Sequence, residues 1–294
     1  MSERHILYLN INGFLGEQNK KDIYKSNEKK AIDRAREEIK NMRENTDSKE
    51  WVEFKLAKKI NSINGEKGWD MIFLSEVDPQ SEATENFINQ MKKYVILNPS
   101  DKYETYKNIP GYSCTICLKK NDLKNYTNKG NGFDEKNDYL HFCKIVSENN
   151  KEVTVLIGIH WAAGSDRIAL FILSLKRLLT FTLGKKINVI LFGDTNANPD
   201  VDLEKAEKEK ETTKIEAYKN NCIFEHLMNE LGLHEIVPEG KPYTFKGETR
   251  IDRVFTNMPK DKAKVEVDQE FLKKDKDKDS LSDHAALVIT YEEV

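Results

Sequence analysis

Short apolar runs that end in a polar residue recur along the chain and restrict its fold more than any other feature. The runs before Glu76 and Asp194 are nearly all apolar, which is typical of strands buried on both faces of a sheet. We expect strands at Ile6–Ile11, Trp69–Ser75, Tyr112–Leu118, Tyr139–Val146, Val153–Ile159, Asn188–Phe192, Arg250–Thr256 and Ala285–Tyr291, and helices at about 26–63, 166–183 and 220–231. Several strands with few helices between them predict a layered α/β or α+β sheet fold.

Composition agrees with one folded domain over 1–294. Hydrophobic residues make up 38% of 294 residues, with 13 Phe and 11 Tyr, which is enough to fill a core. No Pro-, Ser- or Gly-rich linker divides the chain, and three highly charged stretches, at about 17–63, 201–219 and 272–280, are expected to be insertions. A net charge of −3 excludes a protein that coats nucleic acid by bulk charge.

Neither a zinc site nor a targeting segment is expected. Cys114 and Cys117 form a C-x-x-C inside a strand-like run, but no second pair or nearby histidine completes a tetrahedral site, so buried free thiols are the better interpretation. The first residues lack the apolar stretch of a signal peptide, and no apolar run reaches the length of about 18 residues that a membrane span needs. We therefore expect a cytoplasmic protein, a monomer, without stable membrane association.

Polar residues that could carry chemistry stand where the predicted strands end. Strand ends of one sheet converge at an edge, where open α/β sheets place their sites. Hard oxygen ligands such as Glu76 and Asp283, with an amide oxygen from Asn10 or Asn12, suit Mg²⁺ or Mn²⁺. The residues of this set are Asn10, Asn12, Glu76, His160, Asp194, Asn196, Asp252, Asp283 and His284.

This residue set fits metal-assisted hydrolysis of a phosphate ester. Asp194 could accept a proton from the attacking water, Asn196 could donate to a phosphate oxygen, and His160 with His284 could stabilise the developing charge. Asp252 would orient His284, as carboxylates commonly do for catalytic imidazoles. Taken singly, most of these residues are more often structural: the turn at 193–196, for example, is an ordinary Asx-type turn. Glu76 is harder to dismiss, because it directly follows a buried apolar run, where an unpaired carboxylate is costly. Their combination favours a site.

Seven segments together resemble the endonuclease/exonuclease/phosphatase superfamily, the metal-dependent phosphodiesterases and phosphatases built like pancreatic deoxyribonuclease. In chain order they are LNING (9–13), FLSEV (73–77), GYSCTICL (111–118), IGIHW (157–161), LFGDTNANP (191–199), RIDRVF (250–255) and SDHAALVI (282–289). The resemblance implies a four-layered α/β sandwich of two packed mixed sheets. It also implies Glu76 as the main metal ligand, helped by Asn10 and Asp283, with His160 and His284 as the catalytic pair.

Two departures from the family pattern concern His160. Abasic-site endonucleases of the exonuclease III type usually carry Tyr at this position. With His160 here, the chain resembles instead the deoxyribonuclease, sphingomyelinase and inositol-phosphatase branches of the family. Pancreatic-type enzymes support that histidine with an acid in the segment matched by 111–114, where this chain has none, so the partner of His160 stays open. Candidate substrate contacts are Asn12, Tyr112, Trp161 and Arg167; Trp161 could stack on a base or serve only in packing, and Arg167 could touch a phosphate or cap a helix.

The leading hypothesis is a Mg²⁺- or Mn²⁺-dependent phosphodiester hydrolase acting on nucleic acid, with DNA favoured. Lysines at 119, 120, 124, 129, 273 and 274 could flank its cleft. The alternative is a phosphatase or phospholipase-type hydrolase acting on inositol phosphates or sphingomyelin. A membrane-acting enzyme would need an exposed apolar hairpin, which the sequence does not clearly contain. A catalytically silent binding module is a third hypothesis, although every metal and histidine position is filled.

Overall fold

The computed structural model describes most of the chain. It covers residues 2–14, 37, 40–41, 43–44, 47, 51–63, 68–77, 81–97, 113–119, 126–134, 137–148, 152–161, 186–246, 249–272 and 280–293. For residues 2, 13, 95–97 and 113–148 within these ranges, the description is of the backbone alone.

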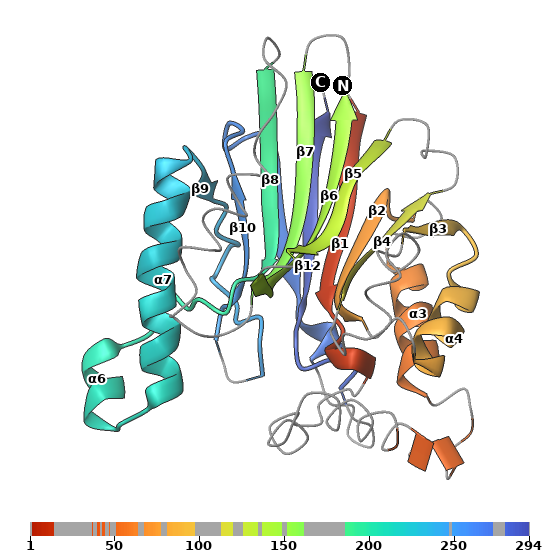
Figure 1. Cartoon of the computed structure of the whole chain (residues 1–294), viewed down its shortest axis with the longest axis horizontal. Coiled ribbons are helices and arrows are strands. Elements are labelled where there is room, and N and C mark those ends of the chain that lie inside the picture. The colour runs from red at the N-terminus through yellow and green to blue at the C-terminus, as the bar shows by residue number, and fades with distance from the viewer. Residues whose placement is uncertain are drawn as a thin grey trace.

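Two six-stranded sheets form the centre of the molecule (Figure 1). The first has the strand order β11-β12-β1-β2-β4-β3, and the second has the order β5-β6-β7-β8-β10-β9. Both are mixed, because β1 pairs with β2 and β7 pairs with β8 in parallel while their other pairs are antiparallel. The strands are β1 (Ser2–Asn10), β2 (Met71–Val77), β3 (Tyr94–Leu97), β4 (Ser113–Lys119), β5 (Tyr126–Asp134), β6 (Asn137–Glu148), β7 (Glu152–Trp161), β8 (Lys186–Asp194), β9 (His234–Glu235), β10 (Asp252–Thr256), β11 (Ala263–Asp268) and β12 (Ala286–Glu293).

Helices cover the outer face of each sheet, which gives four layers (Figure 1). Helices α3 (Val52–Ser62) and α4 (Glu82–Gln90) pack on the first sheet, and α7 (Thr212–Glu230), preceded by the short α6 (Leu203–Lys208), packs on the second. Short 3-10 turns follow β1 and β11, η1 (Asn12–Phe14) and η7 (Gln269–Phe271). Among the described residues, no helix has the length and apolar character that a membrane crossing requires.

Side-chain alternation along the strands divides the core into three parts. On β1, Ile6 and Tyr8 face the other sheet, whereas Leu7 and Leu9 face the helices α3 and α4. The same alternation on β2, β7, β8, β10 and β12 produces one apolar layer between the sheets and one under each set of helices. Residues that continue the inward-facing series beyond the apolar layer therefore meet one another at the end of the sandwich.

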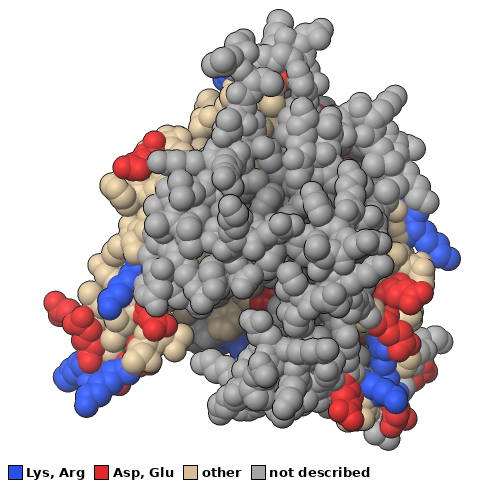
Figure 2. Space-filling model, viewed as in Figure 1, with Lys and Arg blue, Asp and Glu red and all other residues tan. Residues whose placement is uncertain are grey.

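The predicted strands are all present, with ends shifted by a few residues. The sequence did not predict β3, β5, β9, β11 or α4. The stretch 201–219, predicted as an exposed insertion, contains α6 and the first part of α7, so the start predicted for the helix at 220–231 is wrong and the helix begins at Thr212. Most of its charged side chains are exposed, and Figure 2 shows Lys and Arg interspersed with Asp and Glu at the lower left, where α6 lies. The helix expected at 166–183 and most of 17–63 and 272–280 lie outside the described residues.

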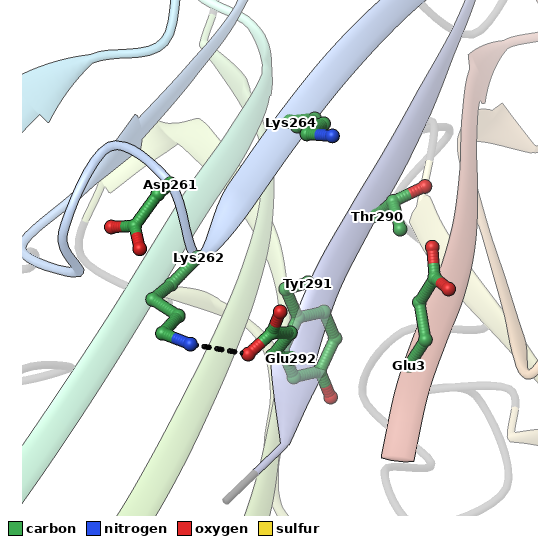
Figure 3. Close-up of a pocket in the computed structure, with 7 residues that line it drawn as sticks. All are labelled: Glu3, Asp261, Lys262, Lys264, Thr290, Tyr291 and Glu292. Atoms are coloured by element: carbon green, nitrogen blue, oxygen red, sulfur yellow. Dashed lines mark hydrogen bonds and ion pairs between the residues drawn. The ribbon is translucent and has the colours of Figure 1, made fainter. Parts of the chain in front are cut away.

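One cavity of about 500 Å³ lies beside the first residues of β1 (Figure 3). Its lining includes Glu3, Lys264 and Thr290, and the ion pair between Lys262 and Glu292, whose Nζ and Oε2 are 2.5 Å apart, closes one side. At about 3.3 Å per strand residue, Glu3 is roughly 23 Å from the far end of β1. This cavity is therefore remote from the polar strand ends described next.

Candidate active site

Strand register in the second sheet places three of the predicted site residues side by side. His160 on β7 is directly opposite Asp194 on β8, and Asp194 is directly opposite Asp252 on β10. Residues that are opposite one another in a sheet share a face. All three continue the inward series that Leu156, Ile190 and Val254 begin, so their side chains point toward the first sheet.

Glu76 reaches this cluster from the first sheet because β2 is irregular at its end. Simple alternation would direct Glu76 to the helix-covered face, since Ser75 is directly opposite the inward-facing Asn10. A register shift between Leu74 and Val77 and a positive φ of 55° at Glu76 turn the side chain inward instead. The Oε1 atom of Glu76 then lies 3.1 Å from Nε2 of His160, so Glu76 is a carboxylate partner of His160 within the described part of the chain.

Asp194 lies at the centre of the site and is 2% exposed. Its Oδ1 accepts a hydrogen bond from the backbone N–H of Asn196 at 2.9 Å, and its Oδ2 accepts one from Nδ2 of Asn10 at 3.2 Å. The Nε2 atoms of His160 and His284 are 3.6 Å and 3.8 Å from the same Oδ2. Burial raises the pKa of Asp194 and the negative charge of Asp252 raises it further, while the two imidazoles oppose this effect. A cation beside Asp194 would therefore favour its ionised form.

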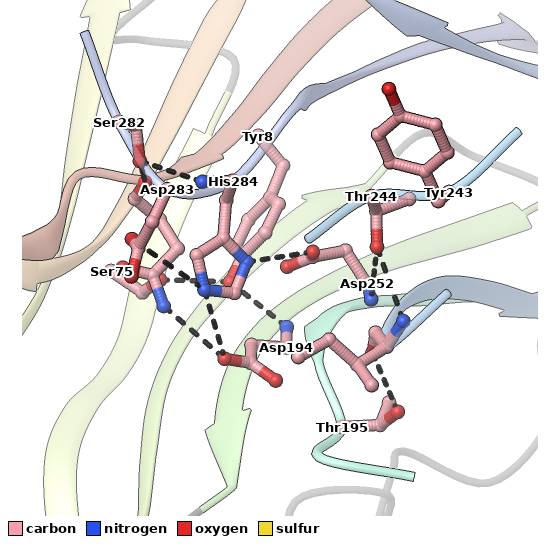
Figure 4. A network of polar contacts seen from close by, with 12 residues as sticks. Tyr8, Ser75, Asp194, Thr195, Tyr243, Thr244, Asp252, Ser282, Asp283 and His284 are labelled. Atoms are coloured by element: carbon pink, nitrogen blue, oxygen red, sulfur yellow. Dashed lines mark hydrogen bonds and ion pairs between the residues drawn. The ribbon is translucent and has the colours of Figure 1, made fainter. Parts of the chain in front are cut away.

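His284 and Asp252 form a buried pair (Figure 4). The imidazole Nδ1 is 2.8 Å from Oδ2 of Asp252, which leaves Nε2 directed at Asp194 and at Oδ1 of Asp283, 3.9 Å away. Burial by itself lowers the pKa of His284, but the charge and hydrogen bond of Asp252, with Asp194 and Asp283, outweigh burial and raise it to about 9. His284 is thus an imidazolium at neutral pH, a strong hydrogen-bond donor aimed into the site.

The oxygen atoms around His284 and Asp194 fit a hard divalent cation. The Oδ1 of Asp283 is buried without a hydrogen-bond partner among the described residues, and the same is true of Oδ1 of Asp252. Buried carboxylate oxygens are costly unless they are paired or bind a metal. Two groups of side chains have ligand atoms within 4.8 Å of one another: Glu76, His160 and Asp194 in one, and Asp194, Asp252 and His284 in the other. Carboxylates are the ligands that Mg²⁺ and Mn²⁺ prefer.

The remaining predicted residues fall into three groups. Asn196 (φ 46°) donates from Nδ2 to the carbonyl of Trp161, and the buried Asn12 (φ 49°) donates its backbone N–H to Oδ1 of Asn10. The suggestion that Trp161 stacks on a base is wrong, because its side chain is fully buried and packs against the Phe224 ring at a centroid distance of 5.6 Å. Tyr112 and Arg167 lie outside the described residues.

Three buried residues that support the site had no role in the sequence prediction. The Oγ1 of Thr244 accepts hydrogen bonds from the backbone N–H groups of Ile251 and Asp252, at 3.1 Å and 2.9 Å. The Oγ of Ser282 donates to the carbonyl of Asn10 at 2.6 Å and accepts from the N–H of His284. Tyr8, on the inward face of β1, contacts the backbone of Asp194. A single hydroxyl residue in a short segment has no sequence pattern that would predict such a role. Only Ser282, which is next to the predicted metal ligand Asp283, could have been found from its position in the sequence.

Comparison with known proteins identifies the fold. No protein-family model and no curated protein matches the sequence. Solved structures match over almost the whole chain: the endonuclease domain of TRAS1, a telomere-specific non-LTR retrotransposon (13% identity, TM-score 0.54, 99% of each chain); D. rerio TDP2 complexed with a single-strand DNA product (16%, 0.55, 100% of each); and an endonuclease/exonuclease/phosphatase family protein from Bacteroides thetaiotaomicron (11%, 0.55, 98% of this chain and 97% of that one). The likeness is one of fold, and it confirms the predicted four-layered sandwich.

Proposed function

We propose that the chain is a metal-dependent phosphodiester hydrolase that acts on nucleic acid, with DNA as the favoured polymer. The observation that carries the proposal is the convergence of Glu76, His160, Asp194 and the Asp252–His284 pair at one end of the sandwich, with their ligand atoms within hydrogen-bonding or ion-pairing distance. These groups come from both sheets, so folding alone brings them together.

In this proposal, Glu76 and Asp283 hold Mg²⁺ or Mn²⁺ together with the amide oxygen of Asn10. The metal, when bound, would supply positive charge for a phosphate oxygen and offset the carboxylates that otherwise repel the substrate. These three residues would bind the cation through oxygen atoms alone. His160 and His284 are then available to contact the substrate. A closed zinc site is disfavoured because none of the three proposed ligands is a thiolate.

The residues of the second sheet would carry the proton and charge transfers. Asp194 receives the proton of the attacking water through Oδ2, the atom that both imidazoles approach. His284, an imidazolium with Asp252 behind it, donates from Nε2 to the oxygen on which negative charge develops. His160, whose Nε2 lies near both Glu76 and Asp194, would make a second such contact. In the structure the Asn196 amide donates to a backbone carbonyl, so we assign it the positioning of the 194–196 turn.

Nucleic acid is favoured as the substrate by two of the structural relatives. One is named as an endonuclease domain and another was solved with a single-strand DNA product. The sequence adds lysines near the matched segments, and a divalent cation would let a nearly neutral chain approach a polyanion without bulk positive charge.

The test is a hydrolysis assay with purified protein on supercoiled plasmid, single-stranded DNA and RNA. We expect nicking with Mg²⁺ or Mn²⁺ and none in excess EDTA. Asp194→Ala and His284→Ala should each lower the rate by about 100-fold to 10,000-fold, as the loss of an acid–base group typically does. Glu76→Ala, which removes a proposed metal ligand, should abolish the metal-dependent activity. His226→Ala, which removes an exposed histidine on α7, is the matched control and should retain full activity.

Other outcomes would change the proposal in defined ways. A protein that leaves all three polymers intact but releases phosphate from inositol phosphates, or phosphocholine from sphingomyelin, is a hydrolase with a different substrate. A protein that binds Mn²⁺ and hydrolyses none of these compounds contradicts the enzymatic proposal altogether.

A further inference from the structure

A tyrosine hydroxyl lies directly beneath the site, where the two sheets meet. Tyr8 is 1% exposed and faces the second sheet from β1, two residues before Asn10. Its hydroxyl lies 2.8 Å from Oγ of Ser75 and accepts the backbone N–H of Asp194 at 2.9 Å (Figure 4). It also lies 3.4 Å from the carbonyl of Ile159. The hydroxyl on β1 therefore contacts residues of β2, β7 and β8.

The three contacts match the full hydrogen-bonding capacity of a phenol. A hydroxyl has one proton to donate and two lone pairs that accept. The Asp194 N–H and the Ser75 hydroxyl can occupy the two lone pairs, and the Tyr8 proton is then directed at the Ile159 carbonyl. Because each partner has a fixed direction, the hydroxyl fixes where the three strand ends lie relative to β1.

Two of these partners belong to the segments that carry the site carboxylates. Ser75 immediately precedes Glu76, and the N–H that Tyr8 accepts is that of Asp194 itself. Glu76 and Asp194 belong to different sheets, so no strand ladder sets the distance between them. The apolar layer between the sheets is non-directional and does not fix that distance to a fraction of an ångström.

Backbone strain at the same two strand ends gives a reason for such a link. Glu76 and Asn196 both have positive φ, 55° and 46°, a region that non-glycine residues enter at a cost. Such conformations persist when surrounding contacts over-determine them. Tyr8 holds the residue before Glu76 and the residue two before Asn196, which are the points where each strained turn begins.

We propose that the Tyr8 hydroxyl is a positioning residue that sets the separation of the Glu76 and Asp194 carboxylates, and through it the affinity of the site for a divalent cation and the rate of the reaction. The part that concerns rate rests on the proposed function, whereas the part that concerns cation affinity does not.

The test compares Tyr8→Phe with the wild-type protein. The variant keeps the ring and its edge-on packing against Phe192, with ring centroids 5.9 Å apart, and loses only the hydroxyl. We expect the dissociation constant for Mn²⁺, measured by electron paramagnetic resonance of the free ion, to rise by about tenfold or more. We expect kcat on the best nucleic-acid substrate to fall by about 10-fold to 100-fold with little change in KM, because small misplacements of reacting groups act on the chemical step.

Tyr291→Phe is the matched control, since Tyr291 is also 1% exposed and also faces the layer between the sheets, from β12. It should leave both the Mn²⁺ affinity and kcat within twofold of wild type. Ser75→Ala, which removes one partner of the hydroxyl, should change both in the same direction as Tyr8→Phe and by less; it decides the matter if Tyr8→Phe does not fold.

The possible outcomes distinguish a failure of this inference from a failure of the proposed function. A folded Tyr8→Phe protein with wild-type Mn²⁺ affinity and wild-type kcat overturns the inference and leaves the function standing. A wild-type protein that binds Mn²⁺ but hydrolyses nothing overturns the function, and the Mn²⁺ affinities still decide the role of Tyr8. A wild-type protein that does not bind Mn²⁺ overturns both.

Discussion

Replacing Asp252 with Asn tests the electrostatic coupling on which the candidate site depends. The carboxylate of Asp252 is 2.8 Å from Nδ1 of His284, and both side chains are almost fully buried. Burial alone would lower the pKa of His284, but Asp252 and its neighbours raise it from 6.5 to about 9. The difference between these two pKa values corresponds to about 3 kcal/mol of preferential interaction with the imidazolium.

The sign of the pH dependence follows from that raised pKa. His284 binds its proton more tightly in the folded chain than in the unfolded chain, so its contribution to stability is complete below about pH 6.5 and is lost as the pH rises through about 9. In Asp252→Asn, burial is opposed by Asp194 and Asp283 without the charge and hydrogen bond of Asp252, so the pKa of His284 should fall from about 9.

Two measurements in EDTA check this expectation. The first is an NMR titration of the His284 ring, assigned by its absence in His284→Gln; it should titrate near pH 9 in the wild type and at a clearly lower pH in the variant. The second is urea unfolding at about pH 6 and pH 9.5, where the wild type should lose more stability than Asp252→Asn does, by an amount of up to about 3 kcal/mol. A wild-type His284 that titrates near 6.5, or an identical pH dependence of unfolding in both proteins, would refute the reasoning.

Two further predictions concern stability. Glu235→Ala removes the carboxylate that accepts two hydrogen bonds from the fully buried Arg253, at 3.0 Å and 2.6 Å, and should lower the free energy of unfolding in urea by about 3–5 kcal/mol. Lys186→Ala, which breaks an exposed ion pair, is its control and should lower the free energy of unfolding by less than about 1 kcal/mol. Equal losses in the two variants would contradict the larger contribution expected from the buried Arg253–Glu235 pair. Gly193→Ala should yield little folded protein, because φ is 136° and an added Cβ would lie 1.9 Å from the carbonyl oxygen of Ile159; a melting temperature within a few degrees of wild type would show that the backbone can shift there.

The sequence predicted the strand ends and the residues on them because a polar side chain after a buried apolar run is directly visible. Asp194 and His160 each follow such a run, and strand register then makes them neighbours. The alternation of buried side chains also predicts which face of a regular strand a residue occupies. This accounts for the second-sheet half of the site.

The first-sheet half could not be predicted in the same way. Alternation places Glu76 on the wrong face, and only the bulge and the positive φ of that residue correct it, which depend on tertiary contacts. Strand β5 (Tyr126–Asp134) contains Gly and Asn, which local preference disfavours in strands, and forms through its pairing with β6. Residues 201–219 were predicted as an exposed, charged insertion, and the sequence did not show that 212–219 belong to helix α7, although mixed charges also suit an exposed helix.

The pairing of β1 with β12 affects how this protein can be made. Ser2 is opposite Glu293 in that pair, and the hydrogen bond from Ser282 to Asn10 joins residues 272 positions apart. At translation rates of roughly 5–20 residues per second, β1 waits for roughly 14–54 seconds before its partner emerges from the ribosome. During that time β1, rich in apolar residues, has one unpaired edge, which is a template for aggregation. We expect the yield of folded protein to respond to chaperones and growth temperature more than its equilibrium stability would suggest, because β12 is synthesised long after β1 and completes its pairing.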